Sequence, residues 1–168
     1  MASSPWEDAL SQSLRERFPG AVRATLSYLG QNFALIEPNA IVPILTWLRD
    51  ECGFDYLVDL TAVDYPKRHA RFELVYILYS HARNERVRLK TEVFEGEAAP
   101  SVTSVFPGAN WLEREVFDMF GVEFHGHPNL RRILMPDEWQ GHPLRKDYSI
   151  IGMDNRWVKE NLGIESGQ

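Results

Sequence analysis

Cysteine is nearly absent from this sequence, since Cys52 is the only one in 168 residues. A single thiol cannot close a disulfide within the chain, and it falls short of the four thiolates that usually hold an iron–sulfur cluster. Long apolar runs are also missing, because none approaches the ~20 residues that a helix needs to cross a bilayer. The first residues lack the basic and apolar stretches of a signal peptide. We therefore expect a cytosolic chain that, if it works at a membrane, is held there by a partner.

The usual motifs of nucleotide-binding and nucleophilic sites are missing as well. The sequence contains no G-x-G-x-x-G, G-x-x-x-x-G-K-[ST], G-x-S-x-G or C-x-x-C. Its 18 Lys and Arg residues against 24 Asp and Glu leave a net charge of −6, which argues against a general footprint for nucleic acid. The residues alone thus favour a non-catalytic protein that acts through partners.

The hydrophobic pattern of residues 1–120 predicts an α+β domain. Helical spacing predicts helices over residues 4–18, 39–52 and 110–120. In the first, Ser4 is the cap and Glu7 completes a capping box. In the second, Pro43 lies in the first turn. A short helix is also expected at 101–106. Alternation predicts strands at 22–28, 33–36, 54–63, 72–79 and 86–94. These elements give a mainly antiparallel sheet of about five strands with helices on one face.

Residues 121–168 have a different character. They hold six of the 11 glycines and no sustained period, yet they are rich in apolar side chains such as Ile150, Ile151 and Trp157. A disordered tail would have few aromatic residues. We therefore expect an irregular, extended C-terminal arm that packs on a partner subunit. The alternative is that the segment folds back over its own sheet.

Three carboxylates and an arginine lie on the helix predicted at 110–120. Glu113, Glu115 and Asp118, beside Arg114, could serve acid–base chemistry. Helical geometry instead places Arg114, Glu115 and Asp118 on one polar arc, with Arg114 and Asp118 as an i,i+4 pair, and Glu113 completes a capping box with the N–H of Asn110. A structural role is favoured, and the polar arc is a candidate docking surface.

Histidines and basic residues gather after this helix. His125, His127 and His142, with Glu123, have the ligand types of a metal site. However, the tripeptides Gly126-His127-Pro128 and Gly141-His142-Pro143 favour histidines that lock turns by hydrogen bonding. Arg131, Arg132, Arg145 and Lys146 follow these tripeptides, and they either bind carboxylates of a partner or of the arm itself or form a solvated face.

The chain resembles a known family along four stretches. These stretches are residues 111–115 (WLERE), 118–121 (DMFG), 124–134 (FHGHPNLRRIL) and 141–148 (GHPLRKDY). They closely resemble the signature of the C subunit of the proton-translocating NADH:quinone oxidoreductase, respiratory complex I (NDH-1). Similarity at 53–54, 60–64 and 71–76 extends the resemblance over most of residues 40–150.

The resemblance implies a core structural subunit of the peripheral arm of that complex, with no catalytic, cofactor or metal site of its own. FMN and iron–sulfur clusters would lie on partner subunits, which pass electrons from NADH to quinone while the complex pumps protons. This chain would support the hydrogenase-like large subunit near the quinone site, on the cytoplasmic side of the inner membrane. The residues carried over as the structural and partner-contact motif are Glu113, Arg114, Glu115, Asp118, Gly121, Gly126, His127, Pro128, Arg131, Arg132, Gly141, Pro143, Arg145, Lys146 and Asp147.

Two other functions stay open from the sequence. The chain could be the equivalent small subunit of a related membrane-bound hydrogenase or ferredoxin–quinone oxidoreductase. Its sequence does not distinguish these assemblies, because electron input lies on other subunits. It could also be a small metal-dependent hydrolase that uses Asp118, Glu123, His125 and His127.

Overall fold

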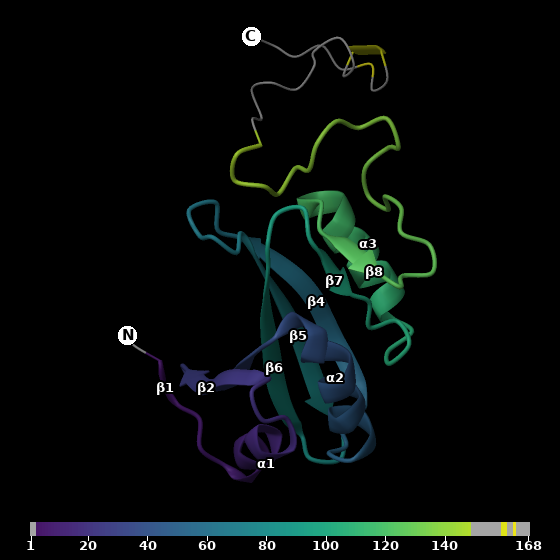
Figure 1. Ribbon diagram of the computed structural model, residues 1–168. Helices are drawn as coiled ribbons and strands as arrows, with labels where there is room; N and C mark the ends of the chain where they lie inside the picture. Colours follow the sequence, from purple (N-terminus) through teal and green to yellow (C-terminus); the bar gives the residue numbers. More distant parts are fainter. Residues whose placement is uncertain (1–2, 149–158, 161–162, 164–168) are drawn as a thin grey trace.

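A six-stranded mixed sheet forms the centre of the protein (Figure 1). The computed structural model describes residues 3–148, 159, 160 and 163. The strands are β1 (Ser4–Pro5), β2 (Val22–Tyr28), β3 (Gln31–Ile36), β4 (Tyr56–Asp64), β5 (Phe72–Ser80) and β6 (Glu85–Val93). Their order is β1-β2-β3-β6-β5-β4; β3 and β6 run parallel, and the other neighbours are antiparallel. The mainly antiparallel α+β fold predicted from the sequence is confirmed.

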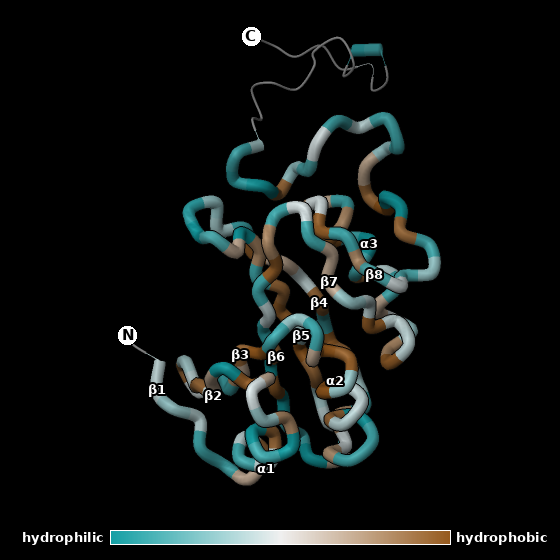
Figure 2. The backbone as a smooth tube through the Cα atoms, viewed as in Figure 1, coloured by the Kyte–Doolittle hydropathy of each residue, from teal (hydrophilic) through white to brown (hydrophobic). Residues whose placement is uncertain are grey.

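The helices pack on one face of this sheet. They are α1 (Ala9–Arg17), the 3-10 helix η1 (Pro38–Ala40), α2 (Ile41–Asp50) and α3 (Ala109–Phe120). Residues of one parity in β5, including Leu74, Tyr76 and Leu78, are fully buried beneath them, because side chains alternate between the faces of a strand. Figure 2 shows hydrophobic residues gathered in α2 and the central strands. This single core fixes where α3 lies, and α3 carries the first two stretches of the family resemblance.

A second, two-stranded sheet joins the start and the end of the α3 region. β7 (Ala98–Pro100) pairs in parallel with β8 (Glu123–His125), so that Ala99 lies opposite Phe124. Both of these side chains are buried. The chain that leaves α3 is therefore tied to the chain that enters it before the irregular segment begins.

Two of the predicted helices need correction. The helix expected over residues 4–18 begins at Ala9, because Asp8 rather than Ser4 is its cap: the Asp8 carboxylate accepts from Ser11 N–H at 2.8 Å, and Ser11 Oγ accepts from Asp8 N–H at 2.9 Å. Residues 4–5 instead form the edge strand β1, the sixth strand of the sheet. The short helix expected at 101–106 is absent. That segment forms turns in which Val105 and Phe106 both donate to the Val102 carbonyl.

Other predicted elements are confirmed within a few residues. Pro43 is the third residue of α2, so the N–H that it lacks belongs to the first turn, where no intrahelical bond is needed. The hairpin of β2 and β3 turns at Leu29 and Gly30. No helix in the described part of the chain is long and apolar enough to cross a membrane.

Candidate functional site

Helix α3 and residues 121–148, called here the C-terminal segment, form the candidate site. The segment runs back around α3 (Figure 1) and is bound to it by side-chain and backbone hydrogen bonds. In the described residues the segment packs against α3 of the same chain. The expectation that residues 121–168 also pack on a partner stays a prediction, and Ile150, Ile151 and Trp157 lie outside the described residues.

Asp118 is the centre of the contact between α3 and the segment. Its side chain is fully buried. One carboxylate oxygen, Oδ1, accepts from Arg132 Nη1 at 2.7 Å, and the other accepts from three consecutive backbone N–H groups, those of Ile133 (3.0 Å), Leu134 (2.8 Å) and Met135 (2.8 Å). Burial alone would raise the pKa of Asp118, but these hydrogen bonds hold it below its usual value. The carboxylate is therefore fixed in its charged form as a structural acceptor.

Arg132 extends this contact along the segment. Besides Asp118, its guanidinium donates to the carbonyls of Trp139 at 3.0 Å and Gly141 at 2.9 Å. A planar guanidinium has five N–H donors in a fixed geometry, so one arginine side chain can bind several acceptors at once. Arg132 thereby holds two turns of the segment against α3.

Arg114 lies on the same side of α3 and is also buried. Its Nε donates to the Arg131 carbonyl at 3.1 Å and its Nη2 to the Arg132 carbonyl at 2.8 Å. The predicted i,i+4 pair of Arg114 with Asp118 is wrong, because each side chain bonds to the segment instead. Of the three residues on the predicted polar arc, Arg114 and Asp118 are buried under the C-terminal segment, and Glu115 is exposed.

Glu113 does not form the predicted capping box. The helix begins at Ala109 without a side-chain cap, and the Glu113 carboxylate accepts from Val102 N–H at 2.6 Å and from the Ser101 hydroxyl at 2.7 Å. Glu113 is fully buried. Burial raises its pKa to about 7, although the two hydrogen bonds oppose the rise. The residue ties α3 to the turns at 101–106.

Gly121 ends α3 in a left-handed conformation at φ +73°. The segment passes so close that a Cβ atom here would lie 2.5 Å from His142 Nε2 and 2.6 Å from Arg145 Nη2. Arg145 Nε donates to the Phe120 carbonyl at 2.5 Å, and the Leu144 N–H donates to the Met119 carbonyl at 3.0 Å. The missing side chain therefore allows the segment to cover the end of the helix.

The two histidine turns bond to the backbone as the sequence predicts. His127 Nδ1 accepts from Asn129 N–H at 3.0 Å, with its Nε2 3.2 Å from the Asn110 carbonyl, and His142 Nδ1 lies 3.0 Å from the Asp118 carbonyl. Burial lowers the pKa of His142. Gly141 has φ +78°, and a Cβ there would lie 2.9 Å from the Tyr148 ring.

A second cluster, centred on Arg71, fixes the far end of the segment. Arg71 forms a two-bond pair with Asp64 at 2.8 and 3.0 Å, and it also contacts Glu95 at 3.1 Å and Asp147 at 2.6 Å. Arg145 reaches the same Glu95 at 2.9 Å. The hydrogen bonds from Arg71 lower the pKa of Asp64 and of Asp147 and raise that of Arg71.

The Arg71 cluster was missed as a site from the sequence, although Asp64 and Arg71 lie in stretches of the resemblance. The usable signal is a charged residue at the end of one predicted strand and another at the start of the next: Asp64 ends β4, and Arg71 directly precedes β5. The Lys146 N–H completes the cluster by donating to Asp64 Oδ2 at 2.7 Å across 82 residues. Local sequence patterns do not predict a contact between residues so far apart in the chain.

The remaining predicted residues do not converge on one point. Glu115, Gly126, Pro128 and Arg131 are exposed, and Pro143 is partly buried. Lys146 and Asp147 are exposed as well, but they join the Arg71 cluster described above. Among the described residues, no three His, Cys, Asp or Glu side chains are placed to hold a metal ion. Asp118, one of the ligands named for a metal-dependent hydrolase, has both oxygens occupied by hydrogen bonds.

Comparisons with known proteins agree with the resemblance. The model of the family described as "Respiratory-chain NADH dehydrogenase, 30 Kd subunit" matches residues 34–154. The chain is 51% identical over 153 residues to the C subunit of the NADH-quinone oxidoreductase of Caulobacter sp. (strain K31), covering 90% of this chain and 71% of that protein. It is 46% identical over 147 residues to the corresponding protein of Caulobacter vibrioides, covering 86% and 74%.

A solved structure has the same fold. A chain from the membrane-bound sulfane sulfur reductase, an archaeal respiratory membrane complex, superposes with a TM-score of 0.74 over 92% of this chain and 90% of its own length. The two sequences are 24% identical. This likeness extends the fold to a different assembly and does not by itself assign a reaction.

Proposed function

Because this chain belongs to the family of the 30 kDa subunit of the respiratory-chain NADH dehydrogenase, we propose that it is a structural subunit of a proton-translocating NADH:quinone oxidoreductase. In this function the chain carries no catalytic group and holds no cofactor. FMN and iron–sulfur clusters on other subunits carry electrons from NADH to quinone. The chain lies in the peripheral arm, on the cytoplasmic side of the inner membrane, held there by its neighbours.

One observation carries the structural role: the buried charged side chains Arg114 and Asp118 of the family stretches are occupied by contacts inside the chain. Asp118 binds Arg132 and three backbone N–H groups, and Arg114 binds two carbonyls. A buried carboxylate whose oxygens are all hydrogen bonded to the protein has no free position for a substrate. These residues support the interpretation that the signature builds a scaffold.

The proposed partner contacts are exposed apolar side chains of the same scaffold. Trp111, Leu134 and Leu144 expose 61%, 62% and 50% of their surface, although large apolar side chains are usually buried. Each is fixed to α3: Trp111 belongs to it, and the backbone N–H groups of Leu134 and Leu144 bond to Asp118 and Met119. We assign these side chains to contacts with the large subunit near the quinone site, since exposed apolar groups on a rigid support favour protein contacts.

Purification of the chain from its own cells tests the proposal. An affinity-tagged copy, expressed from its natural locus and extracted in mild detergent, should co-purify with FMN, several other subunits and NADH:quinone oxidoreductase activity. Recovery as a free chain would contradict the proposal. A co-purifying assembly that lacks flavin and does not oxidise NADH would indicate a related hydrogenase or ferredoxin-fed complex instead. One metal ion per purified chain would favour the hydrolase.

A further inference from the structure

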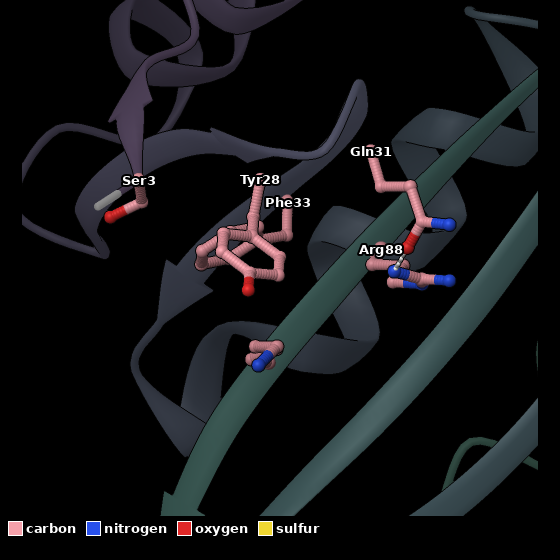
Figure 3. A pocket seen from close by; sticks show the side chains of 6 residues that line it. Ser3, Tyr28, Gln31, Phe33 and Arg88 are labelled. Atoms are coloured by element: carbon pink, nitrogen blue, oxygen red, sulfur yellow. Dashed lines mark hydrogen bonds between the residues drawn. The ribbon is translucent and has the colours of Figure 1, made fainter. Parts of the chain in front are cut away.

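A groove with basic and aromatic walls lies on the face of the sheet opposite the helices. The groove is lined by alternate residues of β3 and β6 and by Tyr28 at the end of β2. The strand register places Tyr28 opposite Gln31 and Phe33 opposite Arg88. The hollow measures about 330 Å³, and a second hollow of about 230 Å³ continues it past Arg86. Figure 3 shows the side chains of Tyr28, Gln31, Phe33 and Arg88 around the first hollow. We call the set Tyr28, Gln31, Phe33, Arg86, Arg88 and Lys90 the basic–aromatic groove.

The cations of this groove are not equivalent. Lys90 pairs with Glu73 at 2.7 Å, and its Nζ lies 4.9 Å from the centre of the Phe33 ring. Arg88 donates to the Gln31 side chain, and neither Arg86 nor Arg88 forms an ion pair with any carboxylate in the part of the chain described. Two guanidinium groups are thus left without a carboxylate on a protein whose net charge is −6.

The spacing of these two arginines sets the geometry of a matching ligand. Residues i and i+2 of a strand point to the same face, and a rise of about 3.3 Å per residue separates them by about 6.6 Å. An extended peptide has the same repeat. Two carboxylates that are two residues apart in such a peptide therefore match Arg86 and Arg88, and each guanidinium can hold a carboxylate through two parallel hydrogen bonds.

We propose that the basic–aromatic groove binds an extended acidic segment of a neighbouring protein, with carboxylates at positions i and i+2 facing Arg88 and Arg86. Tyr28 and Phe33 supply flat apolar surface for the side chain between those carboxylates or beside them. Tyr28 is 44% exposed, so its ring is available to such a segment. The inference rests on the proposed function in one respect, that the neighbour is another subunit of the same complex.

Photo-crosslinking in native membranes tests this proposal. A benzophenone amino acid replaces Tyr28, the membranes are irradiated, and the crosslinked peptide is sequenced. The expected product is a peptide of another subunit with acidic residues two positions apart. The Arg86→Glu/Arg88→Glu variant should lower the yield of that product about tenfold, because two charge-assisted contacts become repulsive.

The control variant is Arg17→Glu/Lys67→Glu, which makes the same change in net charge at exposed positions away from the groove. It should leave the yield within about twofold. Replacing the partner's two acidic residues by lysine should restore crosslinking to the Arg86→Glu/Arg88→Glu chain. The milder Arg86→Gln/Arg88→Gln variant, checked by thermal unfolding, separates lost binding from lost folding.

Several outcomes would overturn the inference. These are a crosslink to lipid or nucleic acid, a crosslinked peptide without paired acidic residues, no crosslinked protein, and no rescue by the charge exchange. If the tagged chain still purifies with NADH:quinone oxidoreductase activity in those cases, the proposed function stands and only the groove assignment fails. The experiment therefore distinguishes failure of the groove assignment from failure of the proposed function.

Discussion

The carboxylate of Asp118 and the guanidinium of Arg132 meet at 2.7 Å in the interior, between the last turn of α3 and a loop 14 residues later. Asp118 is fully buried, and the Arg132 side chain is 15% exposed. A buried pair of this kind does not by itself guarantee stability, but removing one partner leaves an uncompensated charge. The contact therefore makes the position of the C-terminal segment depend on α3.

Asp118→Ala should lower the free energy of unfolding by about 3–5 kcal/mol, because it leaves Arg132 and three backbone N–H groups without their acceptor. Urea unfolding followed by circular dichroism measures the change. Glu115→Ala, an exposed acidic position on the same helix, should change the free energy by no more than about 0.5 kcal/mol. Equal effects of the two substitutions would refute the structural role of Asp118.

Gly121→Ala should destabilise the protein by about 2 kcal/mol or more. The left-handed conformation costs an L residue about 1–2 kcal/mol, and the new methyl group would lie 2.5 Å from the His142 ring. Gly108→Ala is the matched control, since Gly108 has φ −63° and open space around it. That change should be neutral or stabilising by about 0.4–1 kcal/mol. Thermal unfolding of both variants gives the comparison.

Glu113 should make stability depend on pH. Its pKa is raised from 4.5 to about 7 in the folded chain, so the folded state holds the proton more tightly than the unfolded state does. The stability that this provides is complete below about pH 4.5 and is lost as the pH rises through 7. Glu113→Gln keeps a neutral side chain that can still accept from Val102 N–H.

Between pH 4.5 and 8 the wild-type chain should therefore lose stability relative to Glu113→Gln, by on the order of 3 kcal/mol. Urea unfolding at several pH values measures this difference. A parallel pH dependence of the two chains would show that folding does not raise the pKa of Glu113.

The sequence predicted elements better than it predicted contacts. Alternation and helical spacing located β2, β5, β6 and α2, because local periodicity reflects which side of an element is buried. The same reasoning placed Arg114 and Asp118 on one polar arc and paired them with each other, whereas both are buried and bond to the C-terminal segment. Polarity indicates exposure only where no other part of the chain supplies buried hydrogen-bonding partners, and here residues 131–135 supply them.

The Arg71 cluster shows the second limit. Asp64, Glu95 and Asp147 are brought to Arg71 by the pairing of β5 with β4 and with β6 and by the return of the C-terminal segment. The spacing of residues along the sequence does not predict contacts between segments this far apart. The resemblance identified the C-terminal stretches as important, and the three-dimensional arrangement supplied the physical reason.

Arg145→Ala tests whether this chain contributes structure to its complex while other subunits carry the chemistry. Arg145 binds the Phe120 carbonyl and Glu95, so its loss should release the segment that covers α3. Native gels of membranes from the variant strain, with NADH:quinone oxidoreductase activity per assembled complex, give the measurement. Arg17→Ala, at an exposed ion pair on α1, is the control and should assemble normally. We predict less assembled Arg145→Ala complex with normal turnover for each complex that forms; full assembly with slow turnover would contradict the account.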